Sequence, residues 1–343
     1  MARIVVAGAG AIGASVAYHL ALAGAGDVVL CDRAGVASGS TGRAMGGVRQ
    51  QFSTAAEVRL AQESIRFFEE LGPPFFRQVG YLFLATTDEG HRRLEVRLAL
   101  QRSLGVPAEH APVPEGIRAD DVVGAVACWT DGVADPPTVA REVVRRAAGL
   151  GVRVREGVDA REVDRDVLVI CCGPHSPELA PELPIRPLCR QLLETEPRGV
   201  SDELPMVVEE ETGFHFRSRD GRLRIAMHDA EPRWGFDTEV DESVFEDRLA
   251  RLAHRFPAHA GARIDLAWAG LYDMTPDAHP IIGRIAEGVY AACGFSGHGF
   301  MQSPAVGRAL AAEIVGGESP FDLTPYHLAR FAGEPVFPEE LVL

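Results

Sequence analysis

The first residues of the chain alternate short apolar runs with a segment of helical periodicity. Residues 4–7 form an apolar run bounded by glycines, residues 11–23 carry a helical pattern, and residues 28–31 form a second apolar run. This succession within about 30 residues predicts a βαβ unit with parallel strands. Further amphipathic stretches predict helices at 54–71, 89–104, 138–150, 241–256 and 299–315.

The middle of the chain has a different pattern. Between residues 186 and 229, polar and apolar residues alternate over several short stretches separated by turn residues, which predicts an antiparallel sheet. Other apolar runs predict strands at 81–85, 123–129, 152–154, 167–171, 263–272 and 289–292. The pattern therefore indicates an α/β nucleotide-binding unit interleaved with an antiparallel sheet, with several crossings between the two.

Composition removes several classes of function. The 343 residues carry a formal net charge of −15, which disfavours nucleic acid and anionic membranes as partners. The sequence contains neither Lys nor Asn, so a Schiff-base lysine and a P-loop lysine are both excluded. The six cysteines lack zinc-site spacing, no metal site is expected, and no apolar run is long enough to span a membrane. We expect a cytoplasmic protein.

The turn after the first strand carries the clearest motif. Gly8, Gly10 and Gly13 form G-x-G-x-x-G between a strand and a helix, and Asp32 follows about 20 residues later at the end of the second strand. In this context the glycines allow a tight turn and close approach of a pyrophosphate, while the acid accepts ribose hydroxyls. The motif predicts a dinucleotide without a 2′-phosphate, either NAD or FAD.

A second glycine-rich junction near the end of the chain bears on this choice. Residues 294–301, GFSGHGFM, join a short strand to a helix whose positive N-terminal end is suited to a reduced flavin. An ordinary glycine-rich helix start is the alternative. An NAD-dependent dehydrogenase also remains open at this point.

Two longer stretches resemble a known family. Residues 270–283, GLYDMTPDAHPIIG, followed by GFSGHGFMQSPAVG, resemble the C-terminal flavin motif of the sarcosine oxidase and glycine oxidase branch of the D-amino-acid-oxidase-like flavoenzymes. The loop ASGSTGRAMGGVRQQFS resembles the region that wraps the pyrophosphate in that branch. The resemblance covers about residues 3–330.

The resemblance implies two sets of site residues. Arg49 matches an arginine that binds a substrate carboxylate, His228 and Tyr272 match active-site residues, and Arg224 stands where a lysine is credited with activating oxygen. A surface charge, a strand-end histidine and a core tyrosine are the respective alternatives for the first three. The cofactor-binding set comprises Gly8, Gly10, Ala11, Ile12, Gly13, Asp32, Arg33, Ser40, Thr41, Arg43, Val158, Cys172, Gly173, Gly297, His298, Gly299, Phe300 and Met301.

The sequence also departs from the family pattern. Gly270 replaces a cysteine that carries flavin covalently in monomeric sarcosine oxidase, so the FAD is expected to be non-covalent. Met301 replaces a lysine that helps bind the carboxylate, and Arg224 cannot be deprotonated as a lysine can. The stretch 153–168 is short for the family, and the hairpin that usually precedes residues 166–173 is expected to be trimmed.

Together these observations predict a Rossmann-like FAD-binding domain of glutathione-reductase type (1–75, 133–185 and 260–330), an antiparallel-sheet substrate domain (76–132 and 186–259) and a tail (331–343). The implied reaction oxidises the C–N bond of a small amine or amino acid by hydride transfer to flavin N5, with oxygen or another electron acceptor completing the cycle. A flavin-holding subunit with little activity of its own is the alternative, and a homo- or hetero-oligomer is compatible with either.

Overall fold

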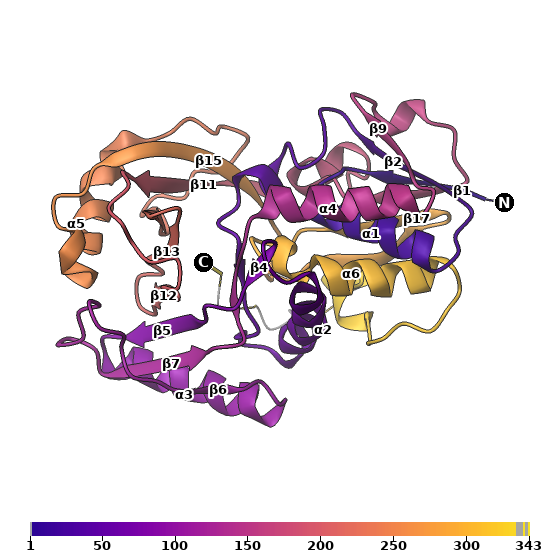
Figure 1. The fold of residues 1–343 in the computed structure, drawn as a ribbon. Coiled ribbons are helices and arrows are strands. Elements are labelled where there is room, and N and C mark those ends of the chain that lie inside the picture. The colour runs from indigo at the N-terminus through magenta and orange to yellow at the C-terminus, as the bar shows by residue number, and fades with distance from the viewer. Residues whose placement is uncertain (1, 334–338, 340–341) are drawn as a thin grey trace.

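The computed structural model describes residues 2–333, 339 and 342–343, and the chain folds into two halves that lie side by side (Figure 1). One half is built on a six-stranded sheet and the other on an eight-stranded sheet. The chain passes between the halves several times, and residue 343 lies between them (Figure 1). No helix in the described residues is long and apolar enough to cross a membrane.

The six-stranded sheet begins with the predicted βαβ unit. Strand β1 (Arg3–Ala7) pairs in parallel with β2 (Asp27–Asp32), and helix α1 (Ala11–Leu22) connects them. The sheet order is β16-β17-β10-β1-β2-β9, and only β16 runs antiparallel to its neighbour. The other strands are β9 (Arg153–Glu156), β10 (Val167–Ile170), β16 (Ile281–Ala286) and β17 (Val289–Cys293).

Strand residues alternate between two cores on the faces of this sheet. Ile4 and Val6 pack in the larger core, which α1 shares with α4 (Pro136–Gly149) and α6 (Gly299–Ile314), whereas Val5 and Ala7 face a smaller core on the other side. This alternation follows from the two-residue period of a strand. Both faces are buried, as expected for a largely parallel sheet.

The eight-stranded sheet has the order β15-β11-β14-β13-β12-β5-β7-β6. All its pairings are antiparallel except that between β12 and β5, so the predicted antiparallel sheet is confirmed with one parallel junction. Its strands are β5 (Tyr81–Ala85), β6 (Ala108–His110), β7 (Gly124–Cys128), β11 (Arg186–Thr195), β12 (Met206–Glu209), β13 (His215–Arg219), β14 (Arg222–Ala226) and β15 (Ile264–Met274).

The remaining elements cover the sheets and connect them. Helix α2 (Ala55–Leu71) packs on α6, α3 (Asp88–Ser103) lies along β7 and β5, and α5 (Phe245–Arg255) covers the far face of the larger sheet through Leu252. A small third sheet contains β3 (Gly47–Val48), β4 (Phe76–Arg77) and β8 (Gly132–Ala134).

The structure differs from the sequence prediction in a few places. Strand β15 pairs along its length with β11 in the eight-stranded sheet, whereas the predicted division assigned this segment to the cofactor-binding domain. Strands β16, β3, β4, β6 and β8 were not predicted, since each is short or interrupted by glycine. Between β9 and β10 the chain forms only a short 3-10 turn (Ala160–Glu162), consistent with the expected trimmed hairpin.

Candidate functional site

A cavity of about 440 Å³ lies between the two halves and is lined by residues of both. One end is lined by residues from the carboxyl ends of β1, β2 and β10, and the other end by residues of the eight-stranded sheet. Ligands of open α/β sheets bind at the carboxyl ends of the strands, so the first end is the expected nucleotide position. We call the two ends the nucleotide end and the sheet end.

The glycine motif closes tightly around the start of α1. Gly8 has a φ of 99°, and a side chain there would lie 2.4 Å from the Cys171 carbonyl oxygen. A Cβ at Gly13 would lie 1.8 Å from the Gly8 carbonyl oxygen, which explains why only glycine allows this helix to approach the strand. Gly13 itself does not line the cavity, so its contribution is to packing.

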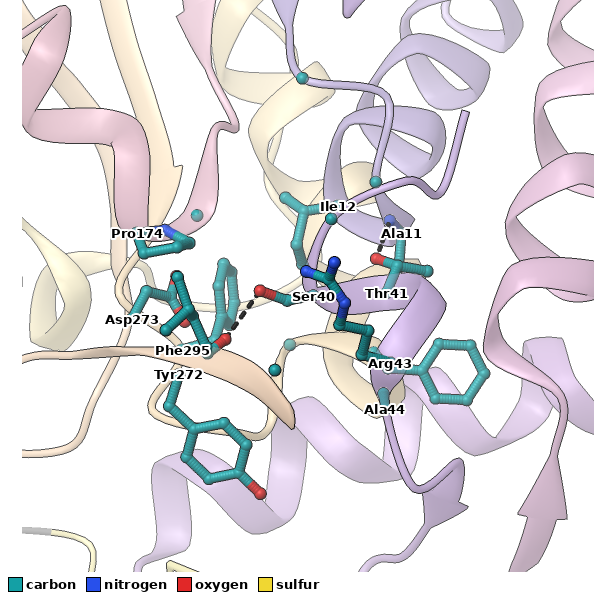
Figure 2. Close-up of a pocket in the computed structure, with 18 of the residues that line it drawn as sticks. Ala11, Ile12, Ser40, Thr41, Arg43, Ala44, Pro174, Tyr272, Asp273 and Phe295 are labelled. Atoms are coloured by element: carbon teal, nitrogen blue, oxygen red, sulfur yellow. Dashed lines mark hydrogen bonds between the residues drawn. The ribbon is translucent and has the colours of Figure 1, made fainter. Parts of the chain in front are cut away.

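The start of α1 is open to an anion. Its N-cap, Gly10, provides no side-chain cap, and the first turn contains no acidic residue. The Thr41 hydroxyl accepts a hydrogen bond from the Ala11 amide at 3.0 Å (Figure 2). The other N–H groups and the helix dipole favour a phosphate at this point.

Asp32 organises the nucleotide end. One oxygen of its carboxylate accepts from the Ala9 amide at 2.8 Å, and the other accepts from the amides of Ala34 and Gly35 at 2.8 and 3.1 Å. These bonds fix the carboxylate at the cavity wall while leaving lone pairs for ribose hydroxyls. Arg33, Val158, Cys172 and Gly173 also line this end.

The loop after β2 passes from the nucleotide end to the sheet end. Ser40 donates from its hydroxyl to the Leu271 carbonyl at 2.7 Å, which ties this loop to β15 (Figure 2). The Arg43 carbonyl accepts from the Trp268 indole at 3.0 Å, and a Cβ at Gly270 would lie 3.0 Å from the Arg43 Cβ. Gly270 therefore lets the loop lie close against the strand.

The second glycine-rich junction forms the wall where the two ends meet. Gly297 has a φ of 97°, and a Cβ there would lie 2.4 Å from the Tyr272 ring. His298, Gly299, Phe300 and Met301 follow at the start of α6 and line the cavity. This helix start also has no side-chain cap and no acidic residue in its first turn.

Asp273 supports this junction from β15. Its carboxylate accepts from the Gly294 amide at 2.7 Å, and its backbone carbonyl accepts from the Ser296 amide at 3.1 Å. Burial raises the pKa of Asp273 to about 6, and the backbone N–H bonds oppose that rise. Asp273 lies within the stretch 270–283 that resembles the flavin motif, but the sequence alone indicates no role for it.

The sheet end presents side chains from one face of the larger sheet. Arg190 on β11, Tyr272 on β15, His215 on β13 and Tyr81 on β5 all line the cavity there. His215 lies within hydrogen-bond distance of the Gly213 carbonyl through Nδ1, at 2.8 Å. Because a carbonyl can only accept, Nδ1 carries the proton and Nε2 keeps its lone pair.

The environment of the sheet end keeps the side chains of His215 and Tyr272 neutral. Burial is the main cause that lowers the pKa of His215 to about 4, and the nearby positive charges of Arg49 and Arg190 act in the same direction. Burial likewise raises the pKa of Tyr272, whose hydroxyl donates to the Leu343 carbonyl at 2.7 Å. The sequence prediction did not include His215. Side chains alternate between the faces of a strand, so Phe214 and Phe216 point into the apolar core and His215 lies on the opposite face.

Arg49, for which the resemblance implies carboxylate binding, is buried at the cavity wall. It is 1% exposed, it lines the cavity, and its guanidinium lies 4.1 Å from the centre of the Phe52 ring. It donates to the Gln51 carbonyl, and Nη2 lies 3.4 Å from His298 Nε2. Burial lowers the pKa of Arg49, so an anion beside it would be strongly favoured.

Two predicted catalytic residues are not among those that line the cavity. Arg224 lies opposite Glu194 across β14 and β11 and forms an ion pair with it at 3.0 Å, with Trp268 stacked 4.8 Å away. This position is two residues before Ala226, the residue of β14 that lines the cavity. A two-residue step moves a strand side chain about 6.6 Å, which removes Arg224 from the sheet end.

His228 follows the end of β14, and the preceding residues Ala226 and Met227 line the cavity in its place. The His228 ring packs against Gly213, where an added Cβ would lie 3.3 Å away, and its carbonyl accepts from Arg248 at 3.0 Å. The geometry thus gives no support to a direct role for Arg224 or His228, and their predicted roles stay predictions.

The cavity fits a flavin dinucleotide. Two helix starts without a capping side chain at the N-cap residue open onto it, and an anchored carboxylate lies at one end. Glycines form its walls where any side chain would collide with backbone or with Tyr272. Of the residues predicted to hold the cofactor, Gly13 is the only one absent from the lining of the cavity formed by the described chain.

Comparison with known proteins agrees with this geometry. The DAO family profile, FAD dependent oxidoreductase, matches residues 3–313. FAD-dependent oxidoreductase domain-containing protein 1 of Xenopus laevis is 26% identical, with 99% of this chain and 85% of that protein covered. Glycine oxidase of Geobacillus kaustophilus (strain HTA426) is 24% identical, with 96% of this chain and 97% of that protein covered.

A solved structure extends the agreement to the fold. The crystal structure of L-proline dehydrogenase from P. horikoshii has a TM-score of 0.89 and 27% identity, with 96% of this chain and 98% of that chain covered. The family match selects FAD over NAD as the cofactor and sets aside the NAD-dependent alternative. On this evidence the chain belongs to the DAO family of FAD-dependent oxidoreductases.

Proposed function

We propose that this oxidoreductase oxidises the C–N bond of a small amine or amino acid to an imine, which water then hydrolyses. The observation that carries the proposal is the continuity of the cavity, in which the nucleotide end leads directly to a sheet end lined by Arg49, His215 and Tyr272. Relatives named glycine oxidase and L-proline dehydrogenase support the class of substrate.

When bound, FAD supplies the acceptor for the hydride that leaves the carbon beside the nitrogen. Gly270 offers no side chain for covalent attachment, so we propose that the FAD is held by non-covalent contacts alone. The start of α6 lies where the two ends of the cavity meet, and its positive end favours negative charge there.

The side chains of the sheet end would bind and orient the substrate. Arg49 would bind the carboxylate of an amino acid, since a buried cation gains most from an anionic partner. His215 Nε2 would accept a hydrogen bond from the amine nitrogen. The positive charges of Arg49 and Arg190 disfavour an ammonium ion, so they favour the neutral amine that hydride loss requires, and no separate side-chain base is needed.

Turnover with an artificial electron acceptor tests the proposal. The FAD-loaded protein should reduce a redox dye in the presence of an N-methyl, cyclic or simple amino acid and release one carbonyl product for each pair of electrons. A protein that holds FAD but reduces neither dye nor oxygen with any amine would contradict the proposal and favour the flavin-holding subunit instead.

A further inference from the structure

Arg190 lines the cavity and has no anionic partner among the residues that the structure describes. It projects from β11 opposite Gly270, lines the sheet end and is half-buried. Its Nε is buried and has no hydrogen-bond partner, and no ion pair of Arg190 occurs within the described part of the chain. Its guanidinium lies 5.6 Å from the centre of the Tyr272 ring, a contact that holds the charge near the cavity.

Two other buried arginines of this half have carboxylate partners. Arg224, on the same face of the sheet, pairs with Glu194 at 3.0 Å, and Arg248 pairs with Asp229 at 3.1 Å. Arg217 also lacks an acceptor for Nε and Nη2, but it does not line the cavity. Because an unpaired cation in a partly dry site is costly, the missing partner of Arg190 is expected to come from whatever fills the cavity.

Two positive charges, those of Arg49 and Arg190, line the sheet end; the acids Glu339 and Asp131 act on the pKa of Arg49 but do not line the cavity. Arg49 follows β3 and Arg190 lies on β11, so the cavity has a cation on each side. Both charges act on the pKa values of His215 and Tyr272, which places them around the same space. Of the described acidic residues that line the cavity, Asp32, Asp159 and Glu178 lie at the nucleotide end, and Asp273 is engaged with the Gly294 amide.

We infer that Arg190 is a specificity-determining residue that binds a second acidic group of the substrate. The inference rests on the proposed function and narrows it. With Arg49 binding one carboxylate and Arg190 the other, the preferred substrate is an amino acid or N-substituted glycine that carries two carboxylates. Neutral His215 and Tyr272 lie between the two arginines as hydrogen-bonding groups for the nitrogen.

Titration with unreactive carboxylates tests this assignment without turnover. Acetate, malonate and succinate are added to the FAD-loaded protein at constant ionic strength, and binding is followed by the change in the flavin absorption spectrum. The wild-type protein should bind one of the dicarboxylates about 10-fold more tightly than acetate, or better, as a charge-assisted hydrogen bond allows. Arg190→Met should remove that preference and leave acetate binding nearly unchanged.

Arg186→Met is the matched control, because Arg186 lies on the same strand but is exposed and stacks on Trp234 outside the cavity. It should keep the wild-type preference. Arg190→Lys, which keeps the charge, should retain part of the preference and also serves if the methionine variant does not fold.

A wild-type protein that shows no preference for dicarboxylates would overturn the inference. An Arg190→Met variant that loses acetate and dicarboxylates equally would also overturn it, since Arg190 would then share the first carboxylate. If dicarboxylates bind through Arg190 but no amine reduces the flavin, the proposed function fails while the binding assignment stands.

Discussion

Replacement of Gly297 by alanine probes the contact on which the whole cavity wall depends. Gly297 has a φ of 97°, a conformation that costs a residue with a Cβ about 1–3 kcal/mol. The new methyl group would also lie 2.4 Å from Tyr272 Cε2 and 2.7 Å from Cζ, so the ring must move. That ring is held by the hydrogen bond from its hydroxyl to the Leu343 carbonyl.

Gly316 offers a control that separates the two effects. Its φ is 73°, but an added Cβ there would meet nothing within 4 Å, so Gly316→Ala introduces backbone strain alone. Overpacking of a filled site typically costs a further ~1–3 kcal/mol. Gly297→Ala should therefore lower the free energy of unfolding by about 2–6 kcal/mol in total, against about 1–3 kcal/mol for Gly316→Ala.

Two assays check this difference. Urea unfolding gives the free energies, and titration of the apoprotein with FAD gives the cofactor dissociation constant. If Gly297→Ala weakens the free energy of FAD binding by about 1.4 kcal/mol, the FAD dissociation constant rises about tenfold. Gly316→Ala should leave that constant at the wild-type value. Equal stability and equal FAD affinity in the two variants would refute the argument that Gly297 is packed against Tyr272 beside the flavin.

Three further predictions concern the substrate, the pH and the cofactor. Arg49→Ala should weaken binding of an amino acid by about 30-fold or more in a flavin-perturbation titration, with partial recovery in Arg49→Lys, whereas a simple amine without a carboxylate should bind as before. The pKa of Asp273 is about 6 in the folded protein against an ordinary value of 3.8, so the folded protein holds the carboxyl proton more tightly than the unfolded chain does. The protonated carboxyl therefore stabilises the folded state below about pH 4, and this stabilisation is lost as the pH rises to about 6. Urea unfolding of Asp273→Asn and wild type from pH 4 to 7 should show this difference, and parallel curves would argue against a buried acid at this position. Acid precipitation should release all yellow colour into the supernatant, since Gly270 cannot carry flavin, and a yellow pellet would contradict non-covalent binding.

The nucleotide end could be predicted closely from the sequence. Gly8, Gly10, Gly13 and Asp32 act through backbone geometry and strand ends, and both are local properties of a βαβ unit. The structure adds that Asp32 bonds to three backbone amides, an arrangement that depends on a loop packed against the turn.

The sheet end could not be predicted as well, because its side chains come from strands distant in sequence. Whether Arg224 reaches the cavity depends on the register between β14 and β11, and that register places it opposite Glu194. The register between β11 and β15 places Arg190 opposite Gly270 beside the cavity. Alternation identifies the face of a strand, but it does not tell which position along the strand meets the ligand.

The central claim is that this chain takes electrons from an amine through its flavin, and anaerobic mixing tests it most directly. The FAD-loaded protein is mixed without oxygen with N-methyl, cyclic, D- and dicarboxylic amino acids, and the visible flavin absorbance is followed. At least one amino acid should bleach the flavin completely, with one carbonyl product formed for each flavin, and a dye should restore the colour. Absorbance that stays unchanged with every amine, in a sample that dithionite bleaches fully, would contradict the account.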